Sequence, residues 1–168
     1  VGGTGNPRNK KELKNLLKKR NSNISWINDW WVKKEIKPYV DRANKMAGWN
    51  FDITTSEAFQ FTKYNKEQFY DWHTDAFDTP HTDGEWKGLI RKLSITVSLS
   101  DPRDYEGGFL EFAVPHHEPT KCEFIKARQA MPRGSIIVFP SYTWHRVTPV
   151  TSGTRLSLVQ WNLGPGYI

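Results

Sequence analysis

Three side chains in this sequence of 168 residues have the types and spacing to hold a metal ion. His73 and Asp75 form an H-x-D pair at the end of an aromatic-rich segment, and His145 lies within residues 144–147, a second aromatic-containing stretch. Residues two apart in a strand share a face, so this imidazole and this carboxylate would point to the same side. Two imidazoles and one carboxylate leave coordination positions open, which is typical of non-haem Fe(II) sites.

A second H-x-D pair, His81 and Asp83, competes with the first. It lies between a proline and a glycine, in a segment typical of a loop. The first pair closes a predicted strand, and a strand holds ligands more rigidly than a loop does. We therefore favour His73 and Asp75. The adjacent histidines at 116–117 are expected in a loop, because neighbouring side chains point in divergent directions.

Arg155 follows His145 by ten residues, and Ser157 shares its face of a predicted strand. A guanidinium fork binds a carboxylate through two parallel charge-assisted hydrogen bonds, and a neighbouring hydroxyl can add a third. Such a pair could anchor the far carboxylate of 2-oxoglutarate while the keto-acid end chelates iron. An isolated strand arginine is more often part of a surface ion pair, so this prediction depends on the three metal ligands.

Two helices are predicted ahead of these residues. Leucines at three- and four-residue steps, surrounded by lysines, predict a helix over residues 9–19, and a second helical region is expected from about 28 to 47. The polar stretch 20–25 is expected to separate them. Pro38 is expected to kink the second helix or to begin a new one, and Gly48 to end it.

Beyond Gly48 the hydrophobic period changes to two, which indicates strands. Apolar residues alternate with serine and threonine over 93–100, which predicts a half-buried strand. Other strands are predicted at 58–64, 68–73, 109–114, 121–127, 135–139, 144–148 and 154–162. Many short strands with turn signals between them favour a jelly roll backed by helices, which is a mainly β fold of the α+β class. We expect one domain over 1–168, with helical support at about 9–47 and a jelly-roll core at about 50–163.

Composition limits the class of protein. The net charge is +6, and several lysines cluster near the N-terminus, so this region could meet nucleic acid or an acidic partner, although a solvated helix face is favoured. The single cysteine, Cys122, excludes an internal disulfide and fits a reducing cytoplasm. No apolar run of about 18 residues and no secretory signal occur, so no membrane partner is expected.

Five segments occur in an informative order: 70–75, 99–108, 139–141, 145–150 and 153–155. Together they resemble the Fe(II)/2-oxoglutarate-dependent dioxygenases, and within them the prolyl 4-hydroxylase-like, PKHD-type hydroxylases. The resemblance covers about residues 57–163. It implies a double-stranded β-helix with N-terminal helices.

The resemblance also implies roles for particular residues. It implies His73, Asp75 and His145 as iron ligands, Arg155 as the 2-oxoglutarate anchor and Tyr64 as a further part of the cosubstrate pocket. The implied reaction hydroxylates a C–H bond and converts 2-oxoglutarate and O₂ to succinate and CO₂, with ascorbate as a further expected cofactor. A prolyl residue of a peptide or protein is the expected substrate.

Three alternative functions compete with this interpretation. An oxidative demethylase of nucleic acid has the same fold, but such enzymes carry a second arginine six residues after the anchor, where this chain has Trp161. A halogenase lacks the carboxylate that Asp75 supplies. A non-enzymatic jelly-roll binding module, of the lectin or cupin kind, would not explain the three ligands together with Arg155.

Two further features could contact a substrate. Residues 77–87 are polar and follow the H-x-D pair, so they are a candidate lid or substrate loop. Trp72, Trp86 and Trp144 could form an aromatic wall for a peptidyl proline, although packing in the core or at the rim is as good an interpretation.

Overall fold

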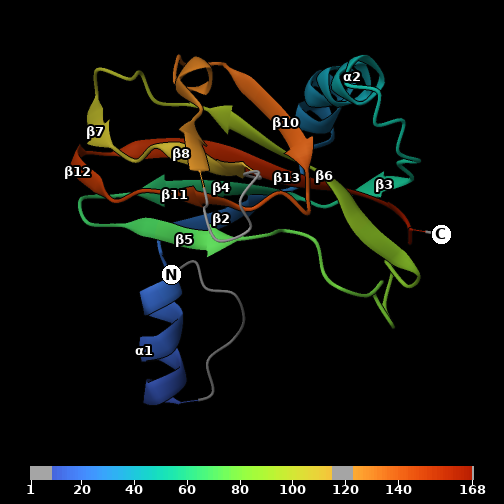
Figure 1. The fold of residues 1–168 in the computed structure, drawn as a ribbon, viewed down its shortest axis with the longest axis horizontal. Coiled ribbons are helices and arrows are strands. Elements are labelled where there is room, and N and C mark those ends of the chain that lie inside the picture. The colour runs from blue at the N-terminus through green and yellow to red at the C-terminus, as the bar shows by residue number, and fades with distance from the viewer. Residues whose placement is uncertain (1–8, 115–122, 168) are drawn as a thin grey trace.

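Two antiparallel sheets make up the body of the protein (Figure 1). The structure is a computed structural model that describes residues 9–114 and 123–167. The larger sheet has the order β10 (Ile136–Pro140), β6 (Leu89–Ser98), β13 (Arg155–Pro165), β4 (Phe59–Tyr64) and β2 (Asn23–Ile27), with β3 (Thr55–Ser56) beside β13. The smaller sheet has the order β1 (Arg20–Asn21), β5 (Phe69–His73), β11 (His145–Val147), β8 (Leu110–Val114) and β9 (Glu123–Lys126).

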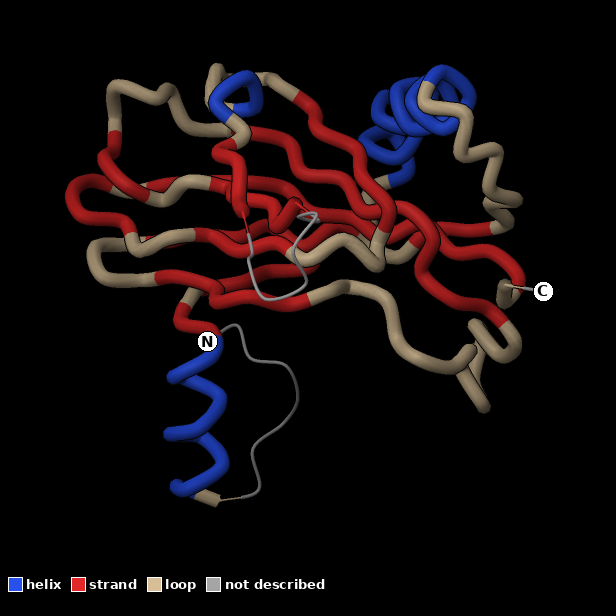
Figure 2. Tube along the Cα trace, in the orientation of Figure 1, coloured by secondary structure: helices blue, strands red, loops and turns tan. Residues whose placement is uncertain are grey.

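A separate two-stranded antiparallel sheet, formed by β7 (Tyr105–Gly107) and β12 (Val150–Gly153), lies at one end of the two larger sheets (Figure 1). Buried apolar side chains from both sheets meet in the space between them, among them Tyr64, Phe112, Phe139 and Val147. This arrangement confirms the predicted jelly roll of mainly β structure, and the strands dominate the chain trace (Figure 2).

The helices lie at the periphery, as Figures 1 and 2 show. α1 (Lys10–Lys19) begins at Asn9, whose side chain accepts a hydrogen bond from the backbone N–H of Glu12; it buries none of its residues and projects from the sheets. α2 (Trp30–Met46) packs Val32 and Val40 against the outer face of the larger sheet. A short 3-10 helix, η1, spans Arg128–Ala130.

Both predicted helices are confirmed, with one refinement. α2 continues through Pro38 as a single helix, so no new helix begins there. Gly48 follows its end with φ 70°, a left-handed conformation that glycine adopts without a steric penalty. No helix in the described part of the chain is long and apolar enough to cross a membrane.

The structure corrects the prediction for the polar stretch 20–25. It was expected only to break the helices, but β1 pairs with β5 there and β2 pairs with β4. The N-terminal region is therefore strand as well as helix. Strand pairing uses backbone groups, so an edge strand does not need the apolar alternation by which a strand is recognised in a sequence.

The structure also corrects the prediction for the burial of β6. It was expected to be half-buried, yet every residue from Lys92 to Ser98 is buried. Leu93 and Ile95 pack toward α2, while Ser94 and Thr96, on the opposite face, point between the two sheets. The polar face of β6 therefore lines the interior of the jelly roll instead of meeting solvent.

Candidate metal and cosubstrate site

Strand register brings the two distant histidines together. His73 ends β5 and His145 begins β11, and these residues are direct partners in the antiparallel pair. Their ring centroids lie 4.1 Å apart, and both side chains are buried. One strand pair thus brings together two residues that lie 72 positions apart in the sequence.

Asp75 completes the cluster from just beyond β5. Its Oδ1 lies 3.5 Å from His73 Nε2 and its Oδ2 lies 3.6 Å from His145 Nε2. Ser94 donates a hydrogen bond to Oδ2 at 2.7 Å, and the Asp75 backbone N–H donates to the carbonyl oxygen of Ser141 at 2.8 Å. The carboxylate is therefore fixed through both its side chain and its backbone.

The pKa values of the cluster suit metal ligands. Burial raises the pKa of Asp75, but the neighbouring imidazoles and the Ser94 hydroxyl more than offset it and hold that pKa well below its usual range. Burial lowers the pKa of His145, which favours the neutral imidazole that coordinates metals. At neutral pH the site therefore offers an ionised carboxylate and an imidazole with a free lone pair.

The orientation of the histidines fits a metal. His73 Nδ1 lies 2.7 Å from the carbonyl oxygen of Asp71, and His145 Nδ1 lies 2.9 Å from that of Thr143. A carbonyl can only accept, so each Nδ1 carries the proton and each Nε2 presents a lone pair to the cluster. The ligand atoms of all three residues lie within 4.8 Å of one another. Two imidazoles and one carboxylate are the donor set that suits Fe(II).

Arg155 lines the same cavity as the three candidate ligands. It is 4% exposed, and its Nη1 lies 3.4 Å from the Ser157 hydroxyl. Its strand partner on β4 is Tyr64, and the centre of the Tyr64 ring lies 5.5 Å from the guanidinium carbon of Arg155. No carboxylate in the described part of the chain forms an ion pair with Arg155. A buried arginine with only neutral neighbours can receive the carboxylate of a ligand.

The same cavity contains a second buried arginine, which no sequence pattern indicated as a site residue. Arg20, on β1, is 5% exposed and is the strand partner of Tyr70. Its guanidinium carbon lies 4.6 Å from the centre of the Tyr70 ring, which in turn stacks on His73 at 3.5 Å between centroids. Burial raises the pKa of Tyr70 to about 12, so its hydroxyl stays protonated. No motif marked Arg20, because it lies in the polar stretch that was expected to be a break.

A wider cavity of about 420 Å³ forms the mouth of the site, and His73 and Asp75 lie on its wall. Arg91 stands at this mouth, with its guanidinium carbon 3.9 Å from the centre of the Trp161 ring. Glu57 pairs with Arg91 through two hydrogen bonds of 2.6 and 2.8 Å. The indole N–H of Trp161 is buried and has no hydrogen-bond partner among the described residues. The wall of the mouth therefore includes an aromatic ring covered by Arg91 and a buried indole N–H without a partner among the described residues.

The competing H-x-D pair lies apart from this cluster. His81 packs between the rings of Phe77 and Trp86, and Asp83 is exposed in the loop. Neither belongs to the group of potential ligands around His73. The histidines at 116–117 and the N-terminal residues 1–8 lie outside the described residues.

The three tryptophans considered for an aromatic wall do not gather at the candidate site. Trp72 contacts Phe124, and Trp144 is largely exposed, so neither lines the cavities at the candidate ligands. Trp72 directly precedes His73 within β5, and successive strand residues point to opposite faces, whereas Trp144 lies just before β11. The aromatic residues that line the mouth include Trp26 and Trp161, whose ring centroids lie 6.2 Å apart, together with Tyr70 and Phe77.

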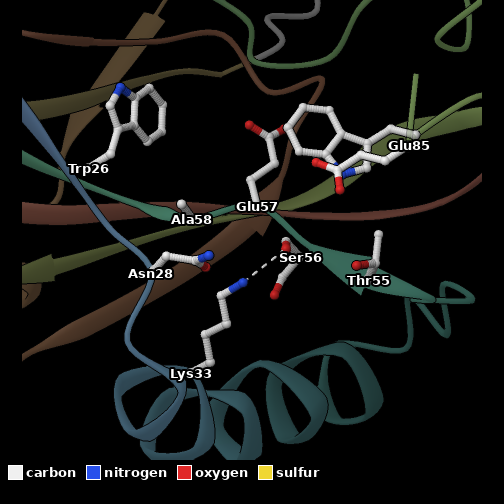
Figure 3. Close-up of a pocket in the computed structure, with 9 residues that line it drawn as sticks. Trp26, Asn28, Lys33, Thr55, Ser56, Glu57, Ala58 and Glu85 are labelled. Carbon is white, nitrogen blue, oxygen red and sulfur yellow. Dashed lines mark hydrogen bonds between the residues drawn. The ribbon is translucent and has the colours of Figure 1, made fainter. Parts of the chain in front are cut away.

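A second cavity, of about 430 Å³, adjoins the mouth (Figure 3). Trp26 lines both cavities, and Trp86 lines only the second. Glu57 also lines the second cavity, and Lys33 reaches from α2 to the backbone carbonyl of Ser56 at 3.4 Å.

Comparison with known proteins identifies the family. The family model described as the 2OG-Fe(II) oxygenase superfamily matches residues 59–162, which is more than half of the chain. The chain belongs to this superfamily. A PKHD-type hydroxylase of Shewanella frigidimarina is 36% identical over 104 residues, which cover 60% of this chain and 41% of that protein. The chain thus spans about two fifths of the length of this curated relative.

Solved structures agree with the fold. The viral collagen prolyl hydroxylase of Paramecium bursaria Chlorella virus-1, in complex with 2OG, superposes with a TM-score of 0.63 at 24% identity, over 90% of this chain and 84% of that one. A prolyl hydroxylase of Trichoplax adhaerens, in complex with a peptide fragment, gives a TM-score of 0.61 at 20% identity, over 85% of this chain and 63% of that one. These likenesses confirm the predicted double-stranded β-helix.

Proposed function

We propose that this chain binds Fe(II) through His73, Asp75 and His145, and 2-oxoglutarate through Arg155. Ser157 and Tyr64 complete the cosubstrate pocket in this proposal. The reaction is the hydroxylation of a C–H bond: 2-oxoglutarate, O₂ and R–H give succinate, CO₂ and R–OH. One observation supports it above the others. A buried cluster of two imidazoles and one carboxylate shares a cavity with a buried arginine that has no acidic partner among the described residues.

The residues of the chain prepare the site for this chemistry. The carbonyl oxygens of Asp71 and Thr143 fix the tautomer of each histidine, so both Nε2 atoms face Asp75. Ser94 holds the carboxylate oxygen nearer His145. Fe(II) held by the three ligands, with 2-oxoglutarate beside it, would activate O₂ for the oxidation of the C–H bond, which is chemistry that side chains alone lack. Burial of the cluster excludes bulk water from the reacting groups.

For the substrate, we propose a prolyl residue in a peptide or protein. The curated relatives are named PKHD-type hydroxylases, and one structural neighbour is a prolyl hydroxylase in complex with a peptide fragment. The cavity beside the metal cluster, of about 420 Å³, has room for residues on either side of a target proline. Trp26, which is 55% exposed and lines both cavities, offers a flat apolar surface on which a proline ring can pack. Assistance by ascorbate and a cytoplasmic location remain predictions.

A spectrum recorded without oxygen tests the proposal. A keto acid that chelates Fe(II) at such a site gives a weak visible charge-transfer band, and no substrate is needed to see it. We expect the band when the protein is mixed with Fe(II) and 2-oxoglutarate, and we expect its loss in Asp75→Ala. Asp83→Ala, in the competing H-x-D pair, is the matched control and should keep the band. Loss of the band in Asp83→Ala but not in Asp75→Ala would show that the wrong pair was chosen.

A further inference from the structure

Arg20 is a buried cation for which the described residues supply no anion. Ser22 accepts a hydrogen bond from its Nε at 2.9 Å, and Gln60 accepts one from its Nη2 at 2.5 Å. Both partners are neutral, and no carboxylate of the described residues forms an ion pair with Arg20. Burying an unpaired charge is costly, and buried arginines are nearly always matched by an anion. The missing anion is therefore expected to be a ligand.

The position of Arg20 indicates which ligand supplies this anion. Arg20 and Arg155 line one cavity together with the metal cluster. Both arginines lie near Tyr64: the Arg155 guanidinium carbon is 5.5 Å from its ring, and the charges of both arginines act to lower the pKa of its hydroxyl, which burial raises. Two buried guanidinium groups around one cavity match a dicarboxylate such as 2-oxoglutarate.

The two arginines lie at different ends of this cavity. Arg20 lines the wider mouth together with His73 and Asp75, whereas Arg155, beside Ser157 at the start of β13, does not. Arg20 is thus at the end nearer the metal cluster. In a keto acid that chelates a metal, the carboxylate next to the keto group lies at that same end.

We propose that Arg20 binds the metal-side carboxylate of 2-oxoglutarate, while Arg155 binds the far carboxylate. This inference rests on the proposed function. It assigns a cosubstrate role to a residue of the N-terminal strand β1, outside the segment that matches the superfamily.

Two keto acids separate the roles of the arginines. 2-Oxoglutarate carries both carboxylates, and 2-oxopentanoate carries only the one next to the keto group. Binding of each to the full chain loaded with Mn(II) is measured by calorimetry. Arg20→Gln is expected to weaken both keto acids by roughly 10- to 100-fold, because it removes charge-assisted hydrogen bonds to the shared carboxylate. Arg155→Gln is expected to weaken 2-oxoglutarate by a similar factor and 2-oxopentanoate by less than about threefold.

Controls separate binding from structural support. The exposed Arg42→Gln on α2 should change neither affinity. The affinity of Arg20→Gln for Mn(II) alone should stay within about twofold of the unmodified protein, since Arg20 is not a ligand. If Arg20→Gln does not fold, Arg20→Lys keeps a cation without the planar fork and should still weaken both keto acids at least fivefold, roughly 1 kcal/mol.

Three outcomes would overturn the inference. Unchanged keto-acid affinities in a folded Arg20 variant would show that its charge serves another ligand, such as a carboxylate of the substrate. Weaker keto-acid binding that only follows a loss of Mn(II) affinity would show a structural role through Tyr70. Failure of the unmodified protein to bind 2-oxoglutarate would remove the proposed function itself, which distinguishes that failure from an error about Arg20.

Discussion

At the scale of residues, two serine hydroxyls decide how Asp75 is held. Ser94 donates to the carboxylate, and its Oγ lies 2.9 Å from the Ser141 Oγ. Both serines are fully buried, so water does not substitute readily for either hydroxyl. Groups that orient a metal ligand tune metal affinity nearly as strongly as the ligands themselves. The position of one carboxylate thus depends on residues from two other segments of the chain.

Removing the Ser94 hydroxyl should therefore weaken metal binding. We expect Ser94→Ala to reduce the affinity for Mn(II) or Fe(II) by about tenfold, because outer groups of this kind are worth 10- to 100-fold. Calorimetric titration of the metal measures this effect. Ser152→Ala, at an exposed position of β12, is the control. Unchanged metal affinity in Ser94→Ala would show that the backbone contact with Ser141 suffices to place the carboxylate.

At the scale of elements, the register of four strands assembles the site. β5 and β11 set His73 opposite His145, and β4 and β13 set Tyr64 opposite Arg155. A shift of one residue in either pair would turn these side chains to the opposite face. The start of β13 is in turn fixed by the close pairing of β12 with β7, where Gly153 lies opposite Tyr105.

Gly153 should be among the least replaceable residues of this pairing. It has φ 71°, and a Cβ there would lie 2.0 Å from the Asp104 carbonyl oxygen. Gly84 has nearly the same φ, 70°, with nothing within 4 Å, so it isolates the cost of the backbone conformation. We expect Gly84→Ala to lower the free energy of unfolding by about 1 kcal/mol and Gly153→Ala by at least about 2 kcal/mol, measured by urea denaturation. Equal losses in the two variants would mean that β7 and β12 separate without cost.

At the scale of the whole molecule, the metal cluster links the two sheets. His73 and His145 belong to the smaller sheet, whereas Ser94, which holds Asp75, belongs to the larger sheet. A ligand that binds only the folded state stabilises it by mass action. A bound metal should therefore stabilise the entire jelly roll and not one loop.

Thermal unfolding measures this linkage. With Mn(II) at about 100 times its Kd, the stabilisation is about 2.7 kcal/mol, which corresponds to a rise in Tm of roughly 5–10 °C for a chain of this length. A chelator should reverse the rise, and Asp75→Ala should not show it. An equal rise in Asp75→Ala would mean that Mn(II) stabilises the protein at some other place.

The sequence by itself determined the chemistry that was available and most of the local structure. The spacing of His73 and Asp75, the later His145 and the pair Arg155 and Ser157 were enough to predict which residues gather. Periodicity was enough for both helices and for most strands, because these patterns depend on neighbours within a few residues. The motifs in order also identified the family, which the match over residues 59–162 confirms.

Only the tertiary structure decided what depends on distant partners. The polar face of β6 was expected at the surface, yet it lines the interior, since burial depends on the second sheet and not on the strand's own alternation. Arg20 lay in a stretch with no apolar pattern, and it enters the site because β1 pairs with β5. Arg91 and Glu57 form an ion pair across a separation that no short motif encodes. Local sequence fixes periodicity, but the pairing of remote strands fixes which side chains share a cavity.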